Sequence, residues 1–169
     1  MTEATPIKLR YRVHLDGGAN VSITNNKNNL SNYRDIGSFA MAGVSHEQPA
    51  IYCNGIGDLP WVSDDGTILL AKCYYSEHAA DTIISPTDVV LHNIHEYYAW
   101  GQYSNLDTGQ GYVEFYRRDG VGKTHFSLTL DNGLWDSRSP MLWRASLNPT
   151  IRACSTISSE DADSKTTRE

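Results

Sequence analysis

The stretch Tyr11-Arg12-Val13-His14-Leu15-Asp16-Gly17-Gly18-Ala19-Asn20 decides how this chain is interpreted. A short apolar strand delivers one carboxylate, and small residues follow it directly. Glycine lets the backbone turn sharply, so the Asp16 carboxylate can lie against peptide N–H groups rather than against side chains. Asp-Gly is also one of the commonest turn dipeptides. The stretch therefore allows two interpretations: a loop that presents a reactive carboxylate, and a plain turn.

Short motifs follow this loop in a fixed order over residues 10–90. They are Ser22-Ile23-Thr24, Leu30 with Tyr33, Met41-Ala42-Gly43-Val44, Gly55-Ile56-Gly57, Cys73-Tyr74-Tyr75 and Ile83-Ile84-Ser85. Each motif is weak separately, but their order and spacing together resemble the protease segment of Ty1/copia-type retrotransposon Pol polyproteins. That family carries an Asp-Ser/Thr-Gly-Ala loop, and the matching stretch here is Leu15-Asp16-Gly17-Gly18-Ala19-Asn20.

The resemblance implies a retropepsin-like aspartic protease and a role for each matching motif. Asp16 would be the catalytic residue of an active-site loop whose other members are Gly17, Gly18, Ala19 and Asn20. A flap that grips substrate would span residues 39–57, with its tip at residues 45–49. Its substrate-binding residues would be Met41, Gly43, Val44, Gly55, Ile56 and Gly57. An ordinary exposed hairpin would explain the same glycines equally well, because glycines in strands often mark bulges or bends.

The resemblance also implies that Ile83, Ile84 and Ser85 brace the catalytic loop from below. A plain core strand followed by a helix cap explains these residues as well, and the two interpretations are compatible. The chain departs from the family at Gly17, where Ser or Thr usually hydrogen-bonds across the two-fold axis of the dimer. Either backbone groups and the Asn20 amide take over part of that network, or the paired loops are held more loosely, or this copy has lost activity.

Peptide hydrolysis by carboxylates requires two of them, because one takes a proton from water while the other gives one to the carbonyl oxygen. The sequence contains one convincing loop of this kind, at Asp16. The other aspartates considered lie beside turns or in polar segments: Asp58, Asp65, Asp81, Asp107, Asp119 and Asp131. The second carboxylate is therefore expected from Asp16 of a second chain in a symmetric homodimer. The polypeptide substrate, which would be the chain's own polyprotein, would lie across the axis as an extended strand.

The short apolar runs bounded by turn residues predict a mainly β protein with one short helix. The resemblance implies a retropepsin-like closed β-barrel or sandwich core at residues 7–95, a β-hairpin extension at 96–136, and a largely disordered linker at 137–169. The expected strands cover residues 7–15, 39–44, 50–55, 67–75, 112–117 and 125–130. Hairpin turns are expected at Asp65-Gly66, Asp119-Gly120 and Asn132-Gly133. Short helices are considered at residues 25–33 and 85–96, the latter capped by Ser85 with Pro86 in its first turn.

The composition excludes several classes of function. With a net charge of −6 over 169 residues, the chain lacks the basic face needed to coat nucleic acid, so no direct nucleic-acid binding is expected. No apolar run approaches the ~20 residues of a membrane span, and the first residues lack a signal-peptide core. We therefore expect an intracellular, cytoplasmic protein that does not bind membranes, located in virus-like particles if the element is active.

The cysteines and histidines suggest no cofactor. Cys53, Cys73 and Cys154 match neither a disulfide framework nor a zinc knuckle, so they are expected to be reduced thiols. The candidate metal ligands Cys73, His78, His92 and His95 lack a recognised spacing, and we expect neither a metal nor a cofactor. His14 lies two residues before Asp16 on the same strand face, and it is interpreted as a half-buried strand residue rather than a general base.

Two other functions compete with an active aspartic endopeptidase. The first is a catalytically inactive protease fold, retained as a remnant or as a peptide-binding or dimerising module. The second is a β-rich structural or interaction domain in which Asp16-Gly17-Gly18 is only a turn. Burial of Asp16 at a two-fold interface would favour the first two possibilities, and exposure at a hairpin tip would favour the turn.

Overall fold

The computed structural model describes residues 12–41 and 50–138. In this part of the chain the fold is mainly β with one short α-helix, as the sequence predicted. The strands are β1 (Arg12–Leu15), β2 (Ser22–Thr24), β3 (Ser31–Met41), β4 (Ile51–Val62), β5 (Ile68–Tyr75), β6 (Ile83–Ile84), β7 (Tyr97–Asn105), β8 (Gln110–Arg117), β9 (Lys123–Asp131) and β10 (Leu134–Arg138). The helix α1 spans Pro86–His92.

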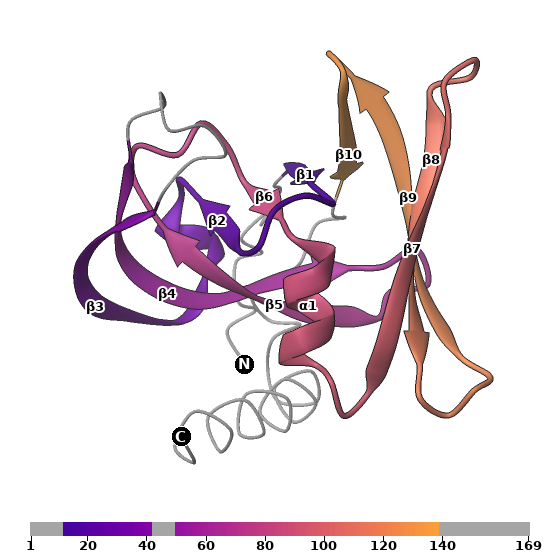
Figure 1. Ribbon diagram of the computed structural model, residues 1–169, viewed down its shortest axis with the longest axis horizontal. Helices are drawn as coiled ribbons and strands as arrows, with labels where there is room; N and C mark the ends of the chain where they lie inside the picture. Colours follow the sequence, from indigo (N-terminus) through magenta and orange to yellow (C-terminus); the bar gives the residue numbers. More distant parts are fainter. Residues whose placement is uncertain (1–11, 42–49, 139–169) are drawn as a thin grey trace, which may run out of the picture.

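The strands form one mixed sheet in the order β3-β4-β5-β2-β6-β1-β10-β9-β8-β7. β1 runs parallel to β6 and β2 runs parallel to β5, whereas the other neighbours are antiparallel. The sheet is strongly bent, with β3 and β4 curving on one side and β7 to β9 standing on the other (Figure 1). Within the described residues no pairing joins β3 to β7, so the expected closed barrel is not shown. In this order β3 and β7 are the two edge strands, and β10 pairs with β1 on one side and with β9 on the other.

Several expected strands and one expected helix have different bounds in the structure. The strand expected at residues 39–44 is the end of the longer β3, and residues 42–44 lie outside the described part. The strand expected at 50–55 continues to Val62 in β4. The prediction of a helix at residues 25–33 was wrong. The structure has a single 3₁₀ turn there, Lys27–Asn29, which leads into β3. The Asn26 side chain caps that turn, and this asparagine-rich stretch has no helical apolar face to bury.

The local signals for turns and for α1 are confirmed. Asp65-Gly66, Asp119-Gly120 and Asn132-Gly133 connect β4 to β5, β8 to β9 and β9 to β10, and each glycine has a positive φ. Hydrogen bonds from Ser63 and Thr67 lower the pKa of Asp65 to about 2. Ser85 caps α1 by accepting a hydrogen bond from the Asp88 N–H at 3.1 Å, and Pro86 is in the first turn. The helix ends at His92, four residues before the expected end.

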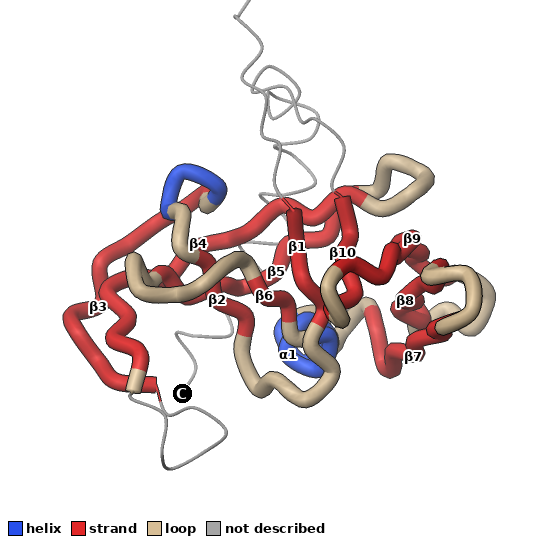
Figure 2. The backbone as a smooth tube through the Cα atoms, turned by 90° about the horizontal axis from the view of Figure 1, so that it is seen from above, coloured by secondary structure: helices blue, strands red, loops and turns tan. Residues whose placement is uncertain are grey.

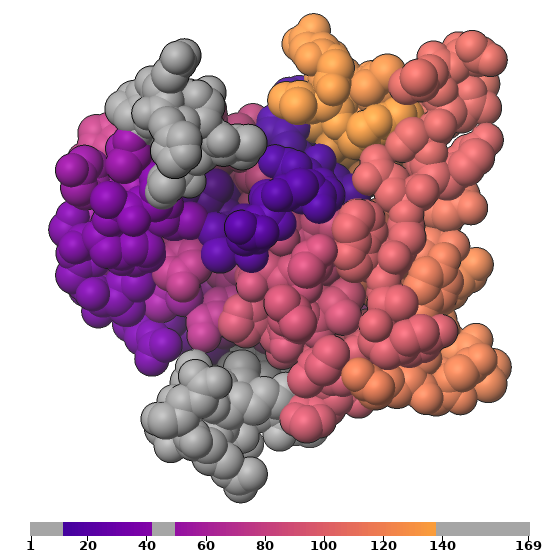
Figure 3. Space-filling view, viewed as in Figure 1, coloured from indigo at the N-terminus to yellow at the C-terminus, as the bar shows by residue number. Residues whose placement is uncertain are grey.

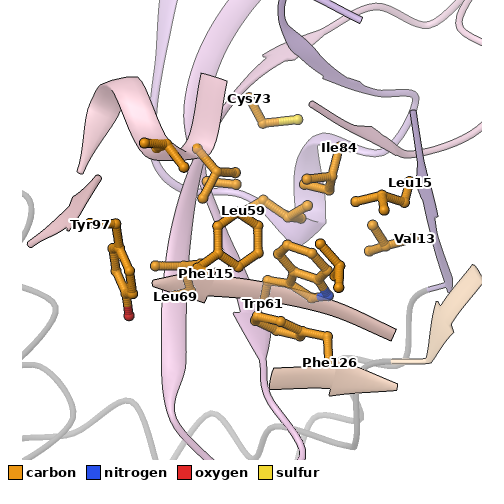
Figure 4. Close-up of a cluster of buried hydrophobic side chains, with 14 of the residues drawn as sticks. Val13, Leu15, Leu59, Trp61, Leu69, Cys73, Ile84, Tyr97, Phe115 and Phe126 are labelled. Carbon is orange, nitrogen blue, oxygen red and sulfur yellow. The ribbon is translucent and has the colours of Figure 1, made fainter. Parts of the chain in front are cut away.

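One hydrophobic core joins the strands on both sides of residue 95 (Figure 4). The indole of Trp61 on β4 stacks on Phe126 of β9, with ring centroids 3.7 Å apart. Tyr97, Phe115 and Phe126 are among its largest fully buried side chains, together with Trp61. The expected division between a core at residues 7–95 and an extension at 96–136 is therefore not a boundary in the packing. Both parts contribute to one sheet and one core.

The expected linker at residues 137–169 begins inside the sheet. Ser137 belongs to β10, is 3% exposed and accepts a hydrogen bond from the Trp61 indole N–H at 3.0 Å. Residues 139–169 lie outside the described part of the chain, as do residues 7–11 of the first expected strand. In the described residues no helix combines the length and the hydropathy required to cross a lipid bilayer.

Candidate functional site

The Asp16 loop connects two strands that are not neighbours. It leaves β1 at Leu15 and reaches β2 at Ser22, while β6 lies between these two strands in the sheet. β6 runs parallel to β1 and antiparallel to β2. In the view from above, β1, β6 and β2 lie side by side with α1 next to them (Figure 2). The loop therefore crosses over the end of β6, and it is not the tip of a hairpin.

Backbone groups hold the first residues of the loop. The Asp16 N–H donates to the Ile84 carbonyl at 3.0 Å, and the Ala19 N–H donates to the Asp16 carbonyl at 3.2 Å. The Gly18 N–H donates to Oδ1 of the Asp16 carboxylate at 2.9 Å, as expected for a carboxylate placed against peptide groups. Asp16, Gly17, Gly18 and Asn20 are exposed and Ala19 is half-buried. This segment, drawn in indigo, lies at the surface beside β7 (Figure 3).

Ile84 and Ser85 contact the loop, as the sequence analysis expected of bracing residues. Besides the Ile84 carbonyl, the Ser85 hydroxyl donates to the Ala19 carbonyl at 2.6 Å. The Ser85 N–H donates to the Ser22 hydroxyl at 3.0 Å, and both serines are fully buried. The second interpretation also holds, since the same Ser85 hydroxyl caps α1. Ile83 pairs with His14 on β1 and with Ile23 on β2. Both ends of the loop are thus tied to the segment 83–85.

Sequence reasoning missed that the indole of Trp100 lies against Gly17. A Cβ placed on Gly17 would lie 3.1 Å from Cη2 of the Trp100 indole, a contact tighter than real Cβ atoms usually make. The indole N–H donates to the Thr87 hydroxyl at 3.1 Å, which fixes the ring between β7 and α1. Gly17 does not have a positive φ, so space rather than backbone conformation explains the glycine here. No spacing in the sequence signals a contact between residues 83 positions apart.

The residues expected to form the flap lie in different surroundings. Met41 ends β3 and pairs with Ile51, while Gly43 and Val44 lie outside the described residues, as does the expected tip. Gly55, Ile56 and Gly57 are buried in β4 between β3 and β5.

Close packing explains the two glycines of β4. A Cβ on Gly55 would overlap the phenol ring of Tyr33. One on Gly57 would lie 2.9 Å from Cβ of Leu30 and from the Ser31 carbonyl oxygen. These glycines therefore allow side chains of β3 and the preceding turn to pack against β4.

The described residues offer Asp16 no second carboxylate, since the Gly18 N–H is the side-chain partner that the structure gives it. Within residues 12–41 and 50–138 no group of three metal-binding side chains is placed to hold an ion. Cys53 and Cys73 are free thiols, as expected, and Cys154 lies outside the described part. Burial raises the pKa of both thiols, which disfavours the thiolate that a cysteine nucleophile requires. The two-carboxylate chemistry considered above would therefore need a second carboxylate from outside the described residues.

No family model matches the chain, and comparisons with curated proteins and with solved structures give no significant match. The function must therefore be argued from the Asp16 loop and its surroundings.

Adding a side chain at Gly17 is expected to destabilise the chain unless Trp100 is made smaller. Gly17→Ser should lower the free energy of unfolding by about 1 kcal/mol, because overpacking a tight contact forces the ring to shift. In a Trp100→Leu background, where the ring is absent, the same substitution should cost less. Urea unfolding of the two single variants and the double variant measures this coupling. Equal costs of Gly17→Ser in both backgrounds would contradict the steric explanation.

Proposed function

We propose that this protein is an aspartic-type endopeptidase of a retrotransposon polyprotein that works as a homodimer. The observation that carries the proposal is the Asp16 loop crossing the end of β6, with the Asp16 N–H bonded to Ile84 and the Ala19 carbonyl bonded to Ser85. A plain hairpin turn would join neighbouring strands, whereas β1 and β2 are separated by β6. Bonds to a segment about 65 residues later are more than a turn needs.

The chemistry follows from two Asp16 carboxylates related by a two-fold axis. Like charges about 3 Å apart do not both ionise, so the pair holds one proton near the working pH. The ionised carboxylate removes a proton from water, and the protonated one donates to the carbonyl oxygen of the scissile peptide bond. Gly17 and Gly18 leave the carboxylate exposed to a partner loop. The reaction needs neither a metal nor a covalent intermediate, and we propose none.

We further propose that the substrate is the polyprotein that contains this chain, bound as an extended strand across the dimer axis. In this proposal the β3–β4 pair belongs to the flap, because β3 and β4 run antiparallel and their described pairing reaches Met41 and Ile51. The proposal includes a retropepsin-like core at residues 7–95. The site of action is the cytoplasm, or the virus-like particle of an active element, and neither nucleic acid nor membrane takes part.

A catalytically inactive protease fold is the second candidate, and the Trp100 contact favours it. The indole lies against Gly17, the position at which the family's Ser or Thr hydroxyl links the two loops, and leaves little room for a side chain there. A chain that lacks this hydroxyl and has little room for one is suited to bind peptide or to dimerise without cleaving. Catalytic activity separates the two candidates.

Digestion of a peptide library by the purified chain at acidic and neutral pH tests the proposal. Cleavage within peptides, lost in Asp16→Asn and unaffected by a metal chelator, would support an aspartic endopeptidase. Stable binding of peptides without cleavage would support the inactive fold. Neither cleavage nor binding, with a folded monomer at all concentrations, would contradict both candidates.

Specific activity is expected to depend on protein concentration, because each chain contributes one carboxylate. Below the dimer dissociation constant, activity per chain should fall about tenfold for each tenfold dilution, since the dimer fraction is then proportional to concentration. Initial rates measured over a dilution series, with mass measured by light scattering, check this. Constant specific activity from a monomer would contradict the shared site.

A further inference from the structure

A buried histidine lies in the strand that carries Asp16. His14 is 5% exposed, and each ring nitrogen contacts a carboxylate. Nδ1 contacts Oδ1 of Asp136 on β10, and Nε2 lies 2.6 Å from Oδ2 of Asp81, in the segment that leads into β6. Asp136 is 3% exposed, and its second oxygen accepts from Nε of Arg12 at 3.0 Å. Arg12 also donates to Asp131 of β9 at 2.8 Å.

The two carboxylates hold the His14 ring from both sides. Nδ1 contacts Asp136 on β10, and Nε2 contacts Asp81 in the segment before β6. Arg12 supplies a positive charge beside Asp136. Buried polar groups are normally hydrogen-bonded, and a ring bonded at both nitrogens links the segments that carry its partners.

The backbone ladders that hold the Asp16 strand are short. β1 has four residues and β6 has two. The His14 N–H donates to the Thr82 carbonyl at 2.9 Å, and the Asp16 N–H donates to the Ile84 carbonyl at 3.0 Å. On the other side, His14 is the register partner of Asp136. Because these strands are short, few backbone hydrogen bonds join them. The side-chain contacts of His14 therefore form a large share of the contacts that hold β1 to β6 and β10.

We propose that His14 is a positioning residue for the Asp16 carboxylate. Its ring ties β1 to β10 through Asp136 and to the segment before β6 through Asp81, and so helps to fix the point at which the loop leaves the strand. Glycine and alanine follow Asp16 and add no long side chains, so the place of the carboxylate depends on this strand together with the backbone bonds of the loop. The catalytic part of this role rests on the proposed function, whereas the placement of the loop does not.

The amide of Gly18 gives a readout that is independent of cleavage, because its N–H donates to the Asp16 carboxylate. We would compare the amide resonances of the full chain and of His14→Gln under one set of conditions. The groups tied to the ring are Asp81 and Asp136, with Arg12 bound to Asp136 and Asp131 bound to Arg12. In His14→Gln, the Gly17 and Gly18 amides should shift from their wild-type positions, because the loop then leaves β1 without the contacts that hold the strand in place.

His125→Gln is the matched control. His125 also lies between two carboxylates, with Nδ1 3.0 Å from Glu114 and Nε2 3.6 Å from Asp64, but it is on β9, two places along the sheet from β1. This variant should leave the Gly17 and Gly18 resonances unchanged. If His14→Gln does not fold, Asp81→Ala removes one of the two contacts at a carboxylate that is 42% exposed. It should shift the same amides.

Kinetics then separate this inference from the proposed function. If the wild-type chain cleaves peptides, His14→Gln should lower kcat by about 10- to 100-fold with KM nearly unchanged, since a misplaced catalytic group loses rate rather than binding. If the wild-type chain cleaves nothing, the proposed function fails, but the amide shifts still decide the positioning role. Gly17 and Gly18 resonances that are the same in the wild-type chain and in the His14 and Asp81 variants would overturn it.

Discussion

Replacement of Asp16 by asparagine is expected to abolish peptide cleavage while leaving the fold intact. In a homodimer this one substitution removes both carboxylates, and with them both the acid and the base, so the rate should fall about 10,000-fold or more. Stability should change little, because Asp16 is exposed and the amide oxygen of asparagine can still accept from the Gly18 N–H. Cleavage rates and thermal unfolding of the two proteins measure both effects.

Asp107→Asn is the matched control for this experiment. Asp107 is also an exposed aspartate in a turn, between β7 and β8, and its replacement removes the same charge. It should retain wild-type cleavage. Undiminished activity of Asp16→Asn, or an equal loss in both variants, would show that Asp16 is not the reacting group.

Truncation of Trp61 is expected to have the largest effect on stability. Trp61 is fully buried, stacks on Phe126, packs edge-on against Phe115 with centroids 5.7 Å apart, and donates to Ser137. Trp61→Ala should lower the free energy of unfolding by about 3–5 kcal/mol, because the cavity removes these contacts and leaves the Ser137 hydroxyl without its partner. Chemical denaturation followed by circular dichroism measures the change.

Two comparisons sharpen this test. Trp61→Phe keeps an aromatic ring in the core and should cost less than the alanine variant. Probes placed on β4 and on β8 should report one shared transition in the wild-type chain, since both strands pack into the same core. Separate transitions would restore the division at residue 95. A cost below about 1 kcal/mol for Trp61→Ala would contradict the packing around the indole.

Local chemistry explains the parts of the fold that were predictable. Gly66, Gly120 and Gly133 of the three expected hairpin turns occupy the left-handed region that these turns require. Ser85-Pro86 begins α1 because a hydroxyl caps the first N–H groups and proline suits the first turn. β5, β8 and β9 lie within two residues of their expected positions. For the candidate site, the placement of Asp16 directly after a strand was predictable for the same reason.

Contacts between residues far apart in the sequence decided the strand order and the surroundings of Asp16. The insertion of β6 between β1 and β2 depends on strand pairing across 60 to 69 residues, and the pairing of β10 with β1 spans 120 to 126. His14 meets Asp136 from 122 residues away, and Gly17 meets Trp100 from 83 away. Turns and caps are favoured by neighbours within four residues. A pairing between distant segments depends on which of many competing partners buries the most surface, and the side chains beside Asp16 are therefore set by the packing of the complete sheet.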